Sequence, residues 1–231
     1  MNLALFTYNF PHKKSHDFLI SLMIDGLKPS IVIAQDYTDL SIPKPTLRVR
    51  PIHKCLIHPK IICDRFKIKF IALNHNSEET QRILKENKID IGVITGSRIL
   101  KQKTIESVKK GIINFHLGII PQHRGLDGLQ WSIFEGKPLG VTAHVIDENI
   151  DAGFIIEKKI IEEKKDDTFI DLSLRIQETQ LCMLSNAIER LYESSANEFP
   201  KVNQGKVYKK MPPELEAKLP SLLEDRLNKL P

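Results

Sequence analysis

Short apolar segments alternate with segments of helical periodicity along most of the chain. Apolar runs predict strands at residues 2–9, 31–34, 70–73, 89–95 and 111–116, and two later runs at 140–146 and 154–161 are close enough to form a hairpin. Helical spacing predicts helices after Ser15 and Ser77 as N-caps, over 104–109, and from Thr168 to Glu193. The pattern therefore predicts an α/β fold, a Rossmann-like mostly parallel sheet flanked by helices, with a C-terminal β-hairpin, long helix and short tail.

Two stretches interrupt this periodicity. Residues 36–59 contain four prolines and predict a long loop with short elements. The last residues are rich in Lys, Glu and Pro, so we expect a main domain over 1–195 and a tail over 196–231 that packs on it or extends from it. The first strand leads into Tyr8-Asn9-Phe10-Pro11, with neither a G-x-G-x-x-G nor a P-loop pattern, which argues against NAD dehydrogenases and P-loop enzymes.

Composition narrows the class of protein further. The chain is 41% hydrophobic and 27% charged, and no run approaches the ~18 apolar residues that span a bilayer. The N-terminus lacks the features of a secretory signal, and three scattered cysteines favour a reducing compartment, so we expect a cytoplasmic protein. The net charge of +5 is spread over Lys-rich segments, which favours a solvated surface over a nucleic-acid footprint.

Three polar side chains mark the ends of late strands. Asn114 and His116 are two residues apart, so their side chains share one face of a strand. An amide and a protonated imidazole converging on one point can stabilise an oxyanion that develops on an attacked carbonyl. Asp151, after another strand, could orient His116, favour its charged form or accept a proton from an attacking amine. No Ser or Cys stands at a nucleophile's position, which favours direct transfer; from spacing alone, a role in satisfying backbone groups at a strand end stays open.

Other candidates remain open on the residues alone. His53, Cys55, His58 and Cys63 fit no common zinc spacing, and we expect no metal. Three further sets of residues could either contact a substrate or have a structural role. His123, Arg124 and Asp127 could cap the following helix instead of binding the acceptor, and His144 could be a packed core histidine. Asn9 with His12-Lys13-Lys14 could bind an acceptor phosphate or form a solvated loop.

The ordered motifs carry a family resemblance, most specific over residues 89–163. They are Ile113-Asn114-Phe115-His116, Pro121-x-x-Arg124-Gly125, Gly140-Val141-Thr142-x-His144 and Asp151-Ala152-Gly153. This set resembles the folate-dependent formyltransferases, whose motifs read approximately N-x-H-x-S-L-L-P-x-x-R-G, G-V/A-T and D-x-G. Gly118 stands where the family usually has Ser, and Ile119-Ile120 replaces Leu-Leu, which leaves the loop geometry beside His116 open.

The resemblance implies a reaction and its site. N10-formyltetrahydrofolate would donate its formyl group to an amine, Asn114 and His116 would stabilise the tetrahedral intermediate, and Asp151 would position His116 or water and assist deprotonation of the amine. The pterin would lie against main chain of Ser97, Arg98, Ile99 and Leu100 and of the loop from Thr142 to Asp147. Asn9, Arg124 and Gly125 would bind the acceptor.

The resemblance also ranks the acceptors. From the residues after the long helix and before the first strand, we expect neither the C-terminal barrel typical of methionyl-tRNA formyltransferases nor the regulatory domain of formyltetrahydrofolate hydrolases. The turn after the first strand is not the Gly/Ser-rich phosphate loop of glycinamide ribonucleotide formyltransferases. What remains is similar to the sugar-nucleotide N-formyltransferases of bacterial polysaccharide biosynthesis, whose tails often carry a segment like Gly205-Lys206-Val207-Tyr208. We expect a small-molecule acceptor, a nucleotide-linked amino sugar, with no nucleic-acid or membrane partner and a homodimer allowed. A hydrolase, a methionyl-tRNA formyltransferase and a catalytically idle binding domain are the alternatives.

Overall fold

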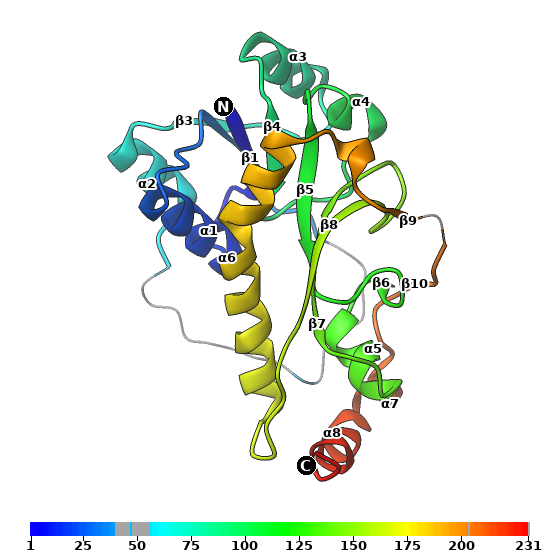
Figure 1. Cartoon of the computed structure of the whole chain (residues 1–231). Helices are drawn as coiled ribbons and strands as arrows, with labels where there is room; N and C mark the ends of the chain where they lie inside the picture. Colours follow the sequence, from blue (N-terminus) through cyan, green and yellow to red (C-terminus); the bar gives the residue numbers. More distant parts are fainter. Residues whose placement is uncertain (40–46, 48–55, 203, 231) are drawn as a thin grey trace.

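A central eight-stranded sheet organises the part of the chain that the computed structural model describes, residues 1–39, 47, 56–202 and 204–230 (Figure 1). Its order is β3-β2-β1-β4-β5-β7-β8-β9, with the first five strands parallel and the last three antiparallel to their neighbours. The strands are β1 Leu3–Tyr8, β2 Ile31–Gln35, β3 Lys69–Ala72, β4 Ile91–Ile94, β5 Gly111–His116, β7 Gly140–Val145, β8 Gly153–Ile160 and β9 Lys201–Val202; β6 Arg124–Gly125 and β10 Val207–Tyr208 form a separate parallel pair. The predicted mostly parallel α/β fold is confirmed.

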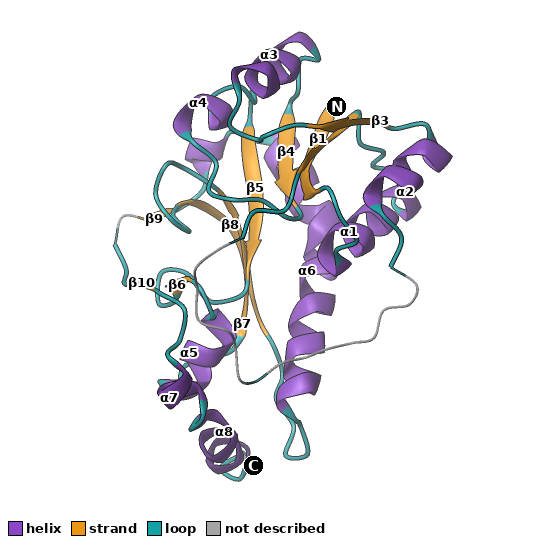
Figure 2. Ribbon diagram, turned by 180° about the vertical axis from the view of Figure 1, so that it is seen from behind, coloured by secondary structure: helices purple, strands orange, loops and turns teal. Residues whose placement is uncertain are grey.

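Helices cover both faces of this sheet (Figures 1 and 2). One apolar cluster includes Phe18 and Leu184 and joins β5 to α1 and α6; the other includes Leu84 and Ile112 and joins the opposite face to α3. The helices are α1 Lys13–Ile24, α2 Pro59–Phe66, α3 Glu78–Glu86, α4 Gln102–Ile105, α5 Gly128–Phe134, α6 Phe169–Glu193, α7 Pro213–Glu216 and α8 Leu219–Leu227, with a 3-10 turn at Ala196–Glu198. None of the described helices is both long and apolar enough to cross a membrane.

Helix boundaries follow the capping chemistry, with one correction. Ser77 and Thr168 cap α3 and α6 as predicted, each accepting a backbone N–H, and Thr168 with Asp171 forms a full capping box. Ser15 is not an N-cap: α1 begins two residues earlier, and the Ser15 hydroxyl is buried inside the helix, 2.9 Å from Nδ1 of His12. The short helix predicted at 104–109 is instead α4, which ends at Ile105.

The segment before β3 contains a helix that the periodicity did not indicate. Pro59, predicted to close a long loop, is the first residue of α2, a position at which its missing N–H is no loss. The Nδ1 of His58 accepts the N–H of Lys60 and caps this helix. Residues 40–46 and 48–55 of the predicted loop lie outside the described residues.

The residues after α6 are part of the sheet system. Strand β9 extends the main sheet beside β8, and β10 pairs with β6 in the turn that follows β5. Helix α8 packs against α5 and contributes Leu219, Leu223 and Leu227 to the larger apolar cluster. The division at residue 195 stays a prediction. Residues on both sides of it belong to the same sheet and to the same apolar cluster.

Candidate active site

The carboxylate of Asp151 connects the polar side chains at the end of β5. Its Oδ1 accepts a hydrogen bond from Nδ2 of Asn114 at 3.2 Å. Its Oδ2 accepts the backbone N–H of Gly125 at 2.8 Å and lies 3.4 Å from Nδ1 of His116. The structure therefore brings the three predicted catalytic residues together around one buried carboxylate.

The backbone of the β7–β8 turn aims this carboxylate. Asp151 has a φ of 42°, in the left-handed region that is costly for a residue with a side chain, and Gly153 has a φ of 93°. A Cβ on Gly153 would lie 2.0 Å from the carbonyl oxygen of Val145, so only glycine allows the chain to enter β8 here. The D-x-G pattern thus has a steric cause.

Asp151 is ionised at neutral pH. Burial alone would raise its pKa, but the hydrogen bond and charge of His116, with the His144 ring and the Gly125 N–H, hold the pKa at about 2. The side chains of Asp151 and His116 are only 16% and 7% exposed, so this charge acts in a poorly solvated environment.

The second nitrogen of His116 is also committed. Its Nε2 lies 2.7 Å from the carbonyl oxygen of His123. Because a carbonyl can only accept, Nε2 carries a proton, and Nδ1 is the nitrogen that faces Asp151. A Cβ on Gly118 would lie 3.0 Å from this Nε2 and 3.1 Å from the His123 oxygen. The glycine that replaces the family's Ser therefore leaves room for the observed ring position.

His144 fixes the orientation of Asn114. Its Nδ1 donates to the carbonyl oxygen of Ala152 at 2.8 Å, which leaves Nε2 as an acceptor for Nδ2 of Asn114 at 3.2 Å. Complete burial lowers the pKa of His144 to about 4, although Asp151 opposes the shift. His144 is therefore a neutral, packed histidine whose contact supports the Asn114 amide.

Lys14 adds a positive charge near the end of β5. The sequence left open whether this lysine contacts a substrate or lies in a solvated loop. It lies in α1, and its Nζ donates to the carbonyl oxygen of Phe115 at 3.1 Å, between the two polar residues of β5. The side chain is partly exposed along its length, but its ammonium is enclosed, and this burial lowers its pKa to about 8 despite the attraction of Asp151. Nothing in the local pattern distinguishes this lysine from its exposed neighbours.

The C-terminal tail packs against the turn whose Gly125 N–H donates to Asp151. Strand β10 pairs with β6, and a Cβ on Gly125 would lie 2.2 Å from the carbonyl oxygen of Tyr208. Asp127 accepts Nζ of Lys210 at 2.7 Å on both oxygens, and it stands at the N-cap position of α5 without capping through its side chain. The tail therefore contributes directly to the geometry around Asp151.

Arg124 and His123 have structural partners on the same turn. Arg124 donates to the carbonyl oxygen of Ile150 at 2.8 and 3.0 Å, which ties this turn to the Asp151 loop. His123 is 1% exposed and contacts Ser132 at 3.0 Å and Glu135 at 3.2 Å. Both side chains position the site, and neither lines its cavity.

A cavity of about 740 Å³ opens beside Asn114, His116 and Asp151. Its volume lies within the roughly 300–1,000 Å³ that small-molecule sites occupy. One side is the turn after β5, and the opposite side is the first half of α6. Its remaining lining residues are Leu47, Phe115, Leu117, Gly125, Leu126, Asp127, Gly128, Leu129, Gln130, Phe169, Ser173, Ile176, Gln177 and Lys210.

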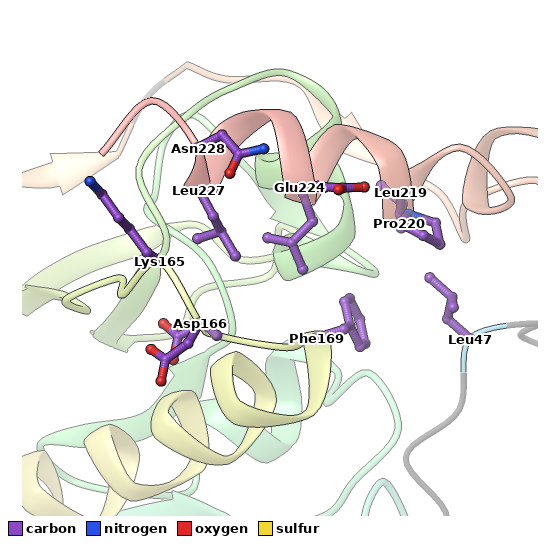
Figure 3. A pocket seen from close by; sticks show the side chains of 11 residues that line it. Leu47, Lys165, Asp166, Phe169, Leu219, Pro220, Glu224, Leu227 and Asn228 are labelled. Atoms are coloured by element: carbon purple, nitrogen blue, oxygen red, sulfur yellow. The ribbon is translucent and has the colours of Figure 1, made fainter. Parts of the chain in front are cut away.

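Another cavity, of about 300 Å³, adjoins the large cavity under α8. Figure 3 shows Phe169 pointing from the first turn of α6 toward α8, with Leu47 below Pro220 in this view. Leu47 and Phe169 line both cavities, so the C-terminal helix forms one border of the site region.

The segment predicted to bind the pterin lies apart from the large cavity. The carbonyl oxygens of Ser97 and Ile99 accept from Tyr8 at 3.0 Å and Asn76 at 2.9 Å, and Arg98 donates to Thr38. Leu100 is buried in the same apolar cluster as Ile112. Because residues 112, 114 and 116 of β5 share a face, this segment lies on the face that carries Asn114 and His116.

Three other predicted binding residues are committed to the fold. Thr142 is fully buried, and its hydroxyl bonds the carbonyl oxygen of Gly118 and the N–H of Ile120, so its side chain stabilises the loop after β5. Asn9 donates to Asp36 at 2.7 Å and does not line the large cavity. Asp147 accepts the N–H of Asn149 within its own turn.

The described residues contain no group of three or more His, Cys, Asp or Glu arranged to hold a metal. His58 caps α2, and burial raises the pKa of the Cys63 thiol to about 12 in the core. His53 and Cys55 of the same candidate cluster lie outside the described residues.

The chain is similar to known proteins both in a family model and in pairwise sequence identity. The family model described as Formyl transferase matches residues 58–188, more than half of the chain. A methionyl-tRNA formyltransferase of Thermodesulfovibrio yellowstonii is 30% identical over 100 residues, which cover 43% of this chain and 32% of that protein. The chain spans about a third to a half of the length of the curated relatives it matches.

Solved structures share the fold over most of the chain. An N-formyltransferase of Helicobacter canadensis, in complex with folinic acid and dTDP-3-aminofucose, superposes with a TM-score of 0.61 at 20% identity, over 90% of this chain and 70% of that one. A phosphoribosylglycinamide formyltransferase of Anaplasma phagocytophilum superposes with a TM-score of 0.64 at 18% identity, over 84% and 88% of the two chains. At these identities the likeness concerns the fold.

Proposed function

Because the chain belongs to the formyl transferase family, we propose that it transfers the formyl group of N10-formyltetrahydrofolate to the amine of an amino-sugar nucleotide. The observation that carries the proposal is the Asp151 carboxylate, which holds Asn114 and His116 at the wall of a substrate-sized cavity. An amide, an imidazole and a carboxylate at one point can stabilise the developing oxyanion and assist the proton transfers that acyl transfer to an amine requires.

The donor fits the face of the sheet that carries these residues. Leu100, Ile94 and Ile146 come from three segments and share the apolar cluster of Ile112. A pterin needs apolar contact on its faces and backbone donors and acceptors at its edge. We propose that the apolar side chains of this cluster supply the first, and that main chain of residues 97–100 and 142–147 supplies the second.

The residues would act as follows. When bound, N10-formyltetrahydrofolate supplies an activated formyl group for the acceptor amine to attack. Asn114 would turn one Nδ2 hydrogen from its 3.2 Å contact with Asp151 toward the carbonyl oxygen that gains negative charge. His116, whose Nδ1 lies 3.4 Å from Oδ2 of Asp151, would stabilise the same oxygen. Asp151, ionised above a pKa of about 2, would orient a water that takes the proton lost by the amine and delivers it to N10 of the folate as the bond between the formyl carbon and N10 breaks.

The extent of the structural similarity favours an amino sugar as the acceptor. The Helicobacter canadensis enzyme, whose complex contains dTDP-3-aminofucose, matches 90% of the chain. That extent includes residues of the C-terminal tail, since fewer than 90% of the residues precede β10 with Tyr208. The tail supplies Lys210 to the lining of the cavity that also includes His116, so we expect an acceptor in this cavity to contact the tail.

A second candidate is formyl transfer to methionyl-tRNA. It is favoured by the curated relatives, which include methionyl-tRNA formyltransferases that are 30% and 34% identical over 100 and 104 residues. Hydrolysis of formyltetrahydrofolate would use the same three residues, with water in place of the amine.

One assay separates these activities. The protein and N10-formyltetrahydrofolate are incubated with dTDP-3-aminofucose, with UDP-4-amino-4,6-dideoxy-L-AltNAc, with methionyl-tRNA or with no acceptor, while tetrahydrofolate formation is followed. The second sugar is the amine form of the UDP-4,6-dideoxy-4-formamido-L-AltNAc in the complex of an Anoxybacillus kamchatkensis formyltransferase, which superposes with a TM-score of 0.54 at 18% identity over 96% of this chain. We expect acceptor-dependent turnover with an amino-sugar nucleotide. Turnover only with methionyl-tRNA, or release of formate without any acceptor, would overturn the proposal. His116→Ala is the matched control and should lower the rate at least ~10²-fold.

A further inference from the structure

A second cavity, of about 240 Å³, lies between the start of α1 and the middle of α6. Gln177 and Leu117 line both this cavity and the catalytic one, so the two are contiguous. It is smaller than the roughly 300–1,000 Å³ of sites for drug-sized molecules, which suits a single ring. Its other lining residues are His12, Lys13, Lys14, Asp17, Phe18, Gln180 and Leu181.

Two glutamine carbonyls in this cavity lack hydrogen-bond partners among the described residues. Gln180 is 2% exposed, and its Oε1 is buried and unpaired; the Oε1 of Gln177 is buried and unpaired as well. A buried acceptor without a donor destabilises the fold, so two such carbonyls at one cavity are acceptors available to the donors of a ligand.

The charges around the cavity select the ligand. Lys13 is neutralised by Asp17 at 2.6 Å. Lys14 forms no ion pair with a described residue and keeps hydrogens besides the one it donates to Phe115. Two unpaired carbonyls disfavour an anion, whereas a hydroxyl can accept from an ammonium and donate to a carbonyl at once.

The remaining walls are apolar. Phe18, Leu117 and Leu181 supply aromatic and aliphatic surface between the polar groups. A pyranose ring combines hydroxyls at its edge with C–H groups on its faces, and this mixture matches the walls of the cavity.

We propose that the second cavity binds a hydroxyl-bearing ring of the acceptor sugar, with the carbonyls of Gln177 and Gln180 as acceptors and Lys14 as a donor. The proposal rests on the proposed function, since it assigns a subsite to that acceptor. It goes further in naming the residues that distinguish a sugar from the nucleotide to which it is attached.

The test measures the binding that the sugar adds to its nucleotide. Calorimetric titrations compare dTDP-3-aminofucose with dTDP, and UDP-4-amino-4,6-dideoxy-L-AltNAc with UDP, for the wild type, Gln180→Leu and Gln102→Leu. Gln102 lies on α4, is exposed and does not line the cavity, so it controls for the substitution itself. We expect Gln180→Leu to weaken the sugar nucleotide about 3- to 10-fold, the effect of one neutral hydrogen bond, and to leave the nucleoside diphosphate unchanged.

Stability provides a second readout. Gln180→Leu removes an unpaired buried carbonyl, so we expect its melting temperature to equal or exceed that of the wild type while binding of the sugar nucleotide is weakened about 3- to 10-fold. A purely structural glutamine would show a lower melting temperature and unchanged sugar binding, and this result would overturn the proposal.

The outcomes distinguish the two proposals. If amino-sugar nucleotides are formylated but Gln180→Leu binds them as the wild type does, the subsite is wrong and the proposed function stands. If neither sugar nucleotide binds more tightly than its nucleoside diphosphate, and only methionyl-tRNA or water accepts the formyl group, the proposed function fails and the sugar subsite with it.

Discussion

Replacing Asp151 by Asn keeps the shape of the side chain and removes its charge. Both carboxylate oxygens accept from donors, Oδ1 from Asn114 and Oδ2 from Gly125. An amide offers only one acceptor, so its NH₂ group must face one of these donors. A buried donor left unpaired costs about 1–3 kcal/mol, and we expect Asp151→Asn to lose roughly that much stability at pH 7.

The pKa of Asp151 makes this cost pH-dependent. It falls from 3.8 to about 2 on folding, against the effect of burial, because of His116 and the Gly125 N–H. Ionised Asp151 therefore stabilises the folded state above pH 4, and this contribution is lost as the pH falls toward 2. The shift corresponds to about 2 kcal/mol, so the difference in stability between the wild type and Asp151→Asn should shrink by about this amount between pH 5 and pH 2.

Urea unfolding, followed by the fluorescence of the single tryptophan Trp131, measures this difference. Glu148→Gln is the matched control, an exposed carboxyl in the same turn that should change stability by less than about 0.5 kcal/mol. Parallel curves of stability against pH for the wild type and Asp151→Asn would refute the assignment of Asp151 as an ionised, buried acceptor.

Three further variants probe the surroundings of the site. Gly125→Ala places a Cβ 2.2 Å from the Tyr208 oxygen at a φ of 95°, so we expect a loss of at least about 1–3 kcal/mol in thermal unfolding; an unchanged midpoint would contradict the β6–β10 pairing. Lys210→Met leaves Asp127, 12% exposed, without its cation and should cost about 1–3 kcal/mol in urea unfolding, whereas a neutral effect would show that the tail is not held there. The pKa of Lys14 drops from 10.5 to about 8 on burial, so the stability of the wild type should rise relative to Lys14→Met between pH 8 and pH 10.5, and a constant difference would contradict the enclosed ammonium.

The core of the fold could be predicted because apolar runs of strand length report burial on both faces. Residues 111–116 were predicted and observed as β5, and Ser77 and Thr168 cap helices as expected. The prediction of Ser15 as an N-cap is wrong. A serine before an apolar stretch resembles a cap, but the Ser15 hydroxyl lies within α1 and contacts His12 and Thr95.

The site was predictable to the extent that it depends on motif and strand position. The two-residue spacing of Asn114 and His116 fixes their common face of β5. The contacts of Asp151 with both side chains depend on how the β7–β8 turn packs, which the local sequence does not show. Contacts made through tertiary structure left no local signal. The enclosure of Lys14 by α1 and β5, and the pairing of the tail with Gly125, depend on segments far apart in sequence.

The proposed transfer of a formyl group to the amine of a sugar nucleotide can be followed through the formyl carbon itself. The most direct measurement supplies N10-formyltetrahydrofolate labelled with ¹³C in the formyl group and follows the label by NMR in the presence of the amino-sugar nucleotides. We predict that the label appears as a formamide carbon on one of these sugars, and that Asn114→Ala and His116→Ala suppress its appearance. Label that remains on folate or appears only as formate would contradict the account.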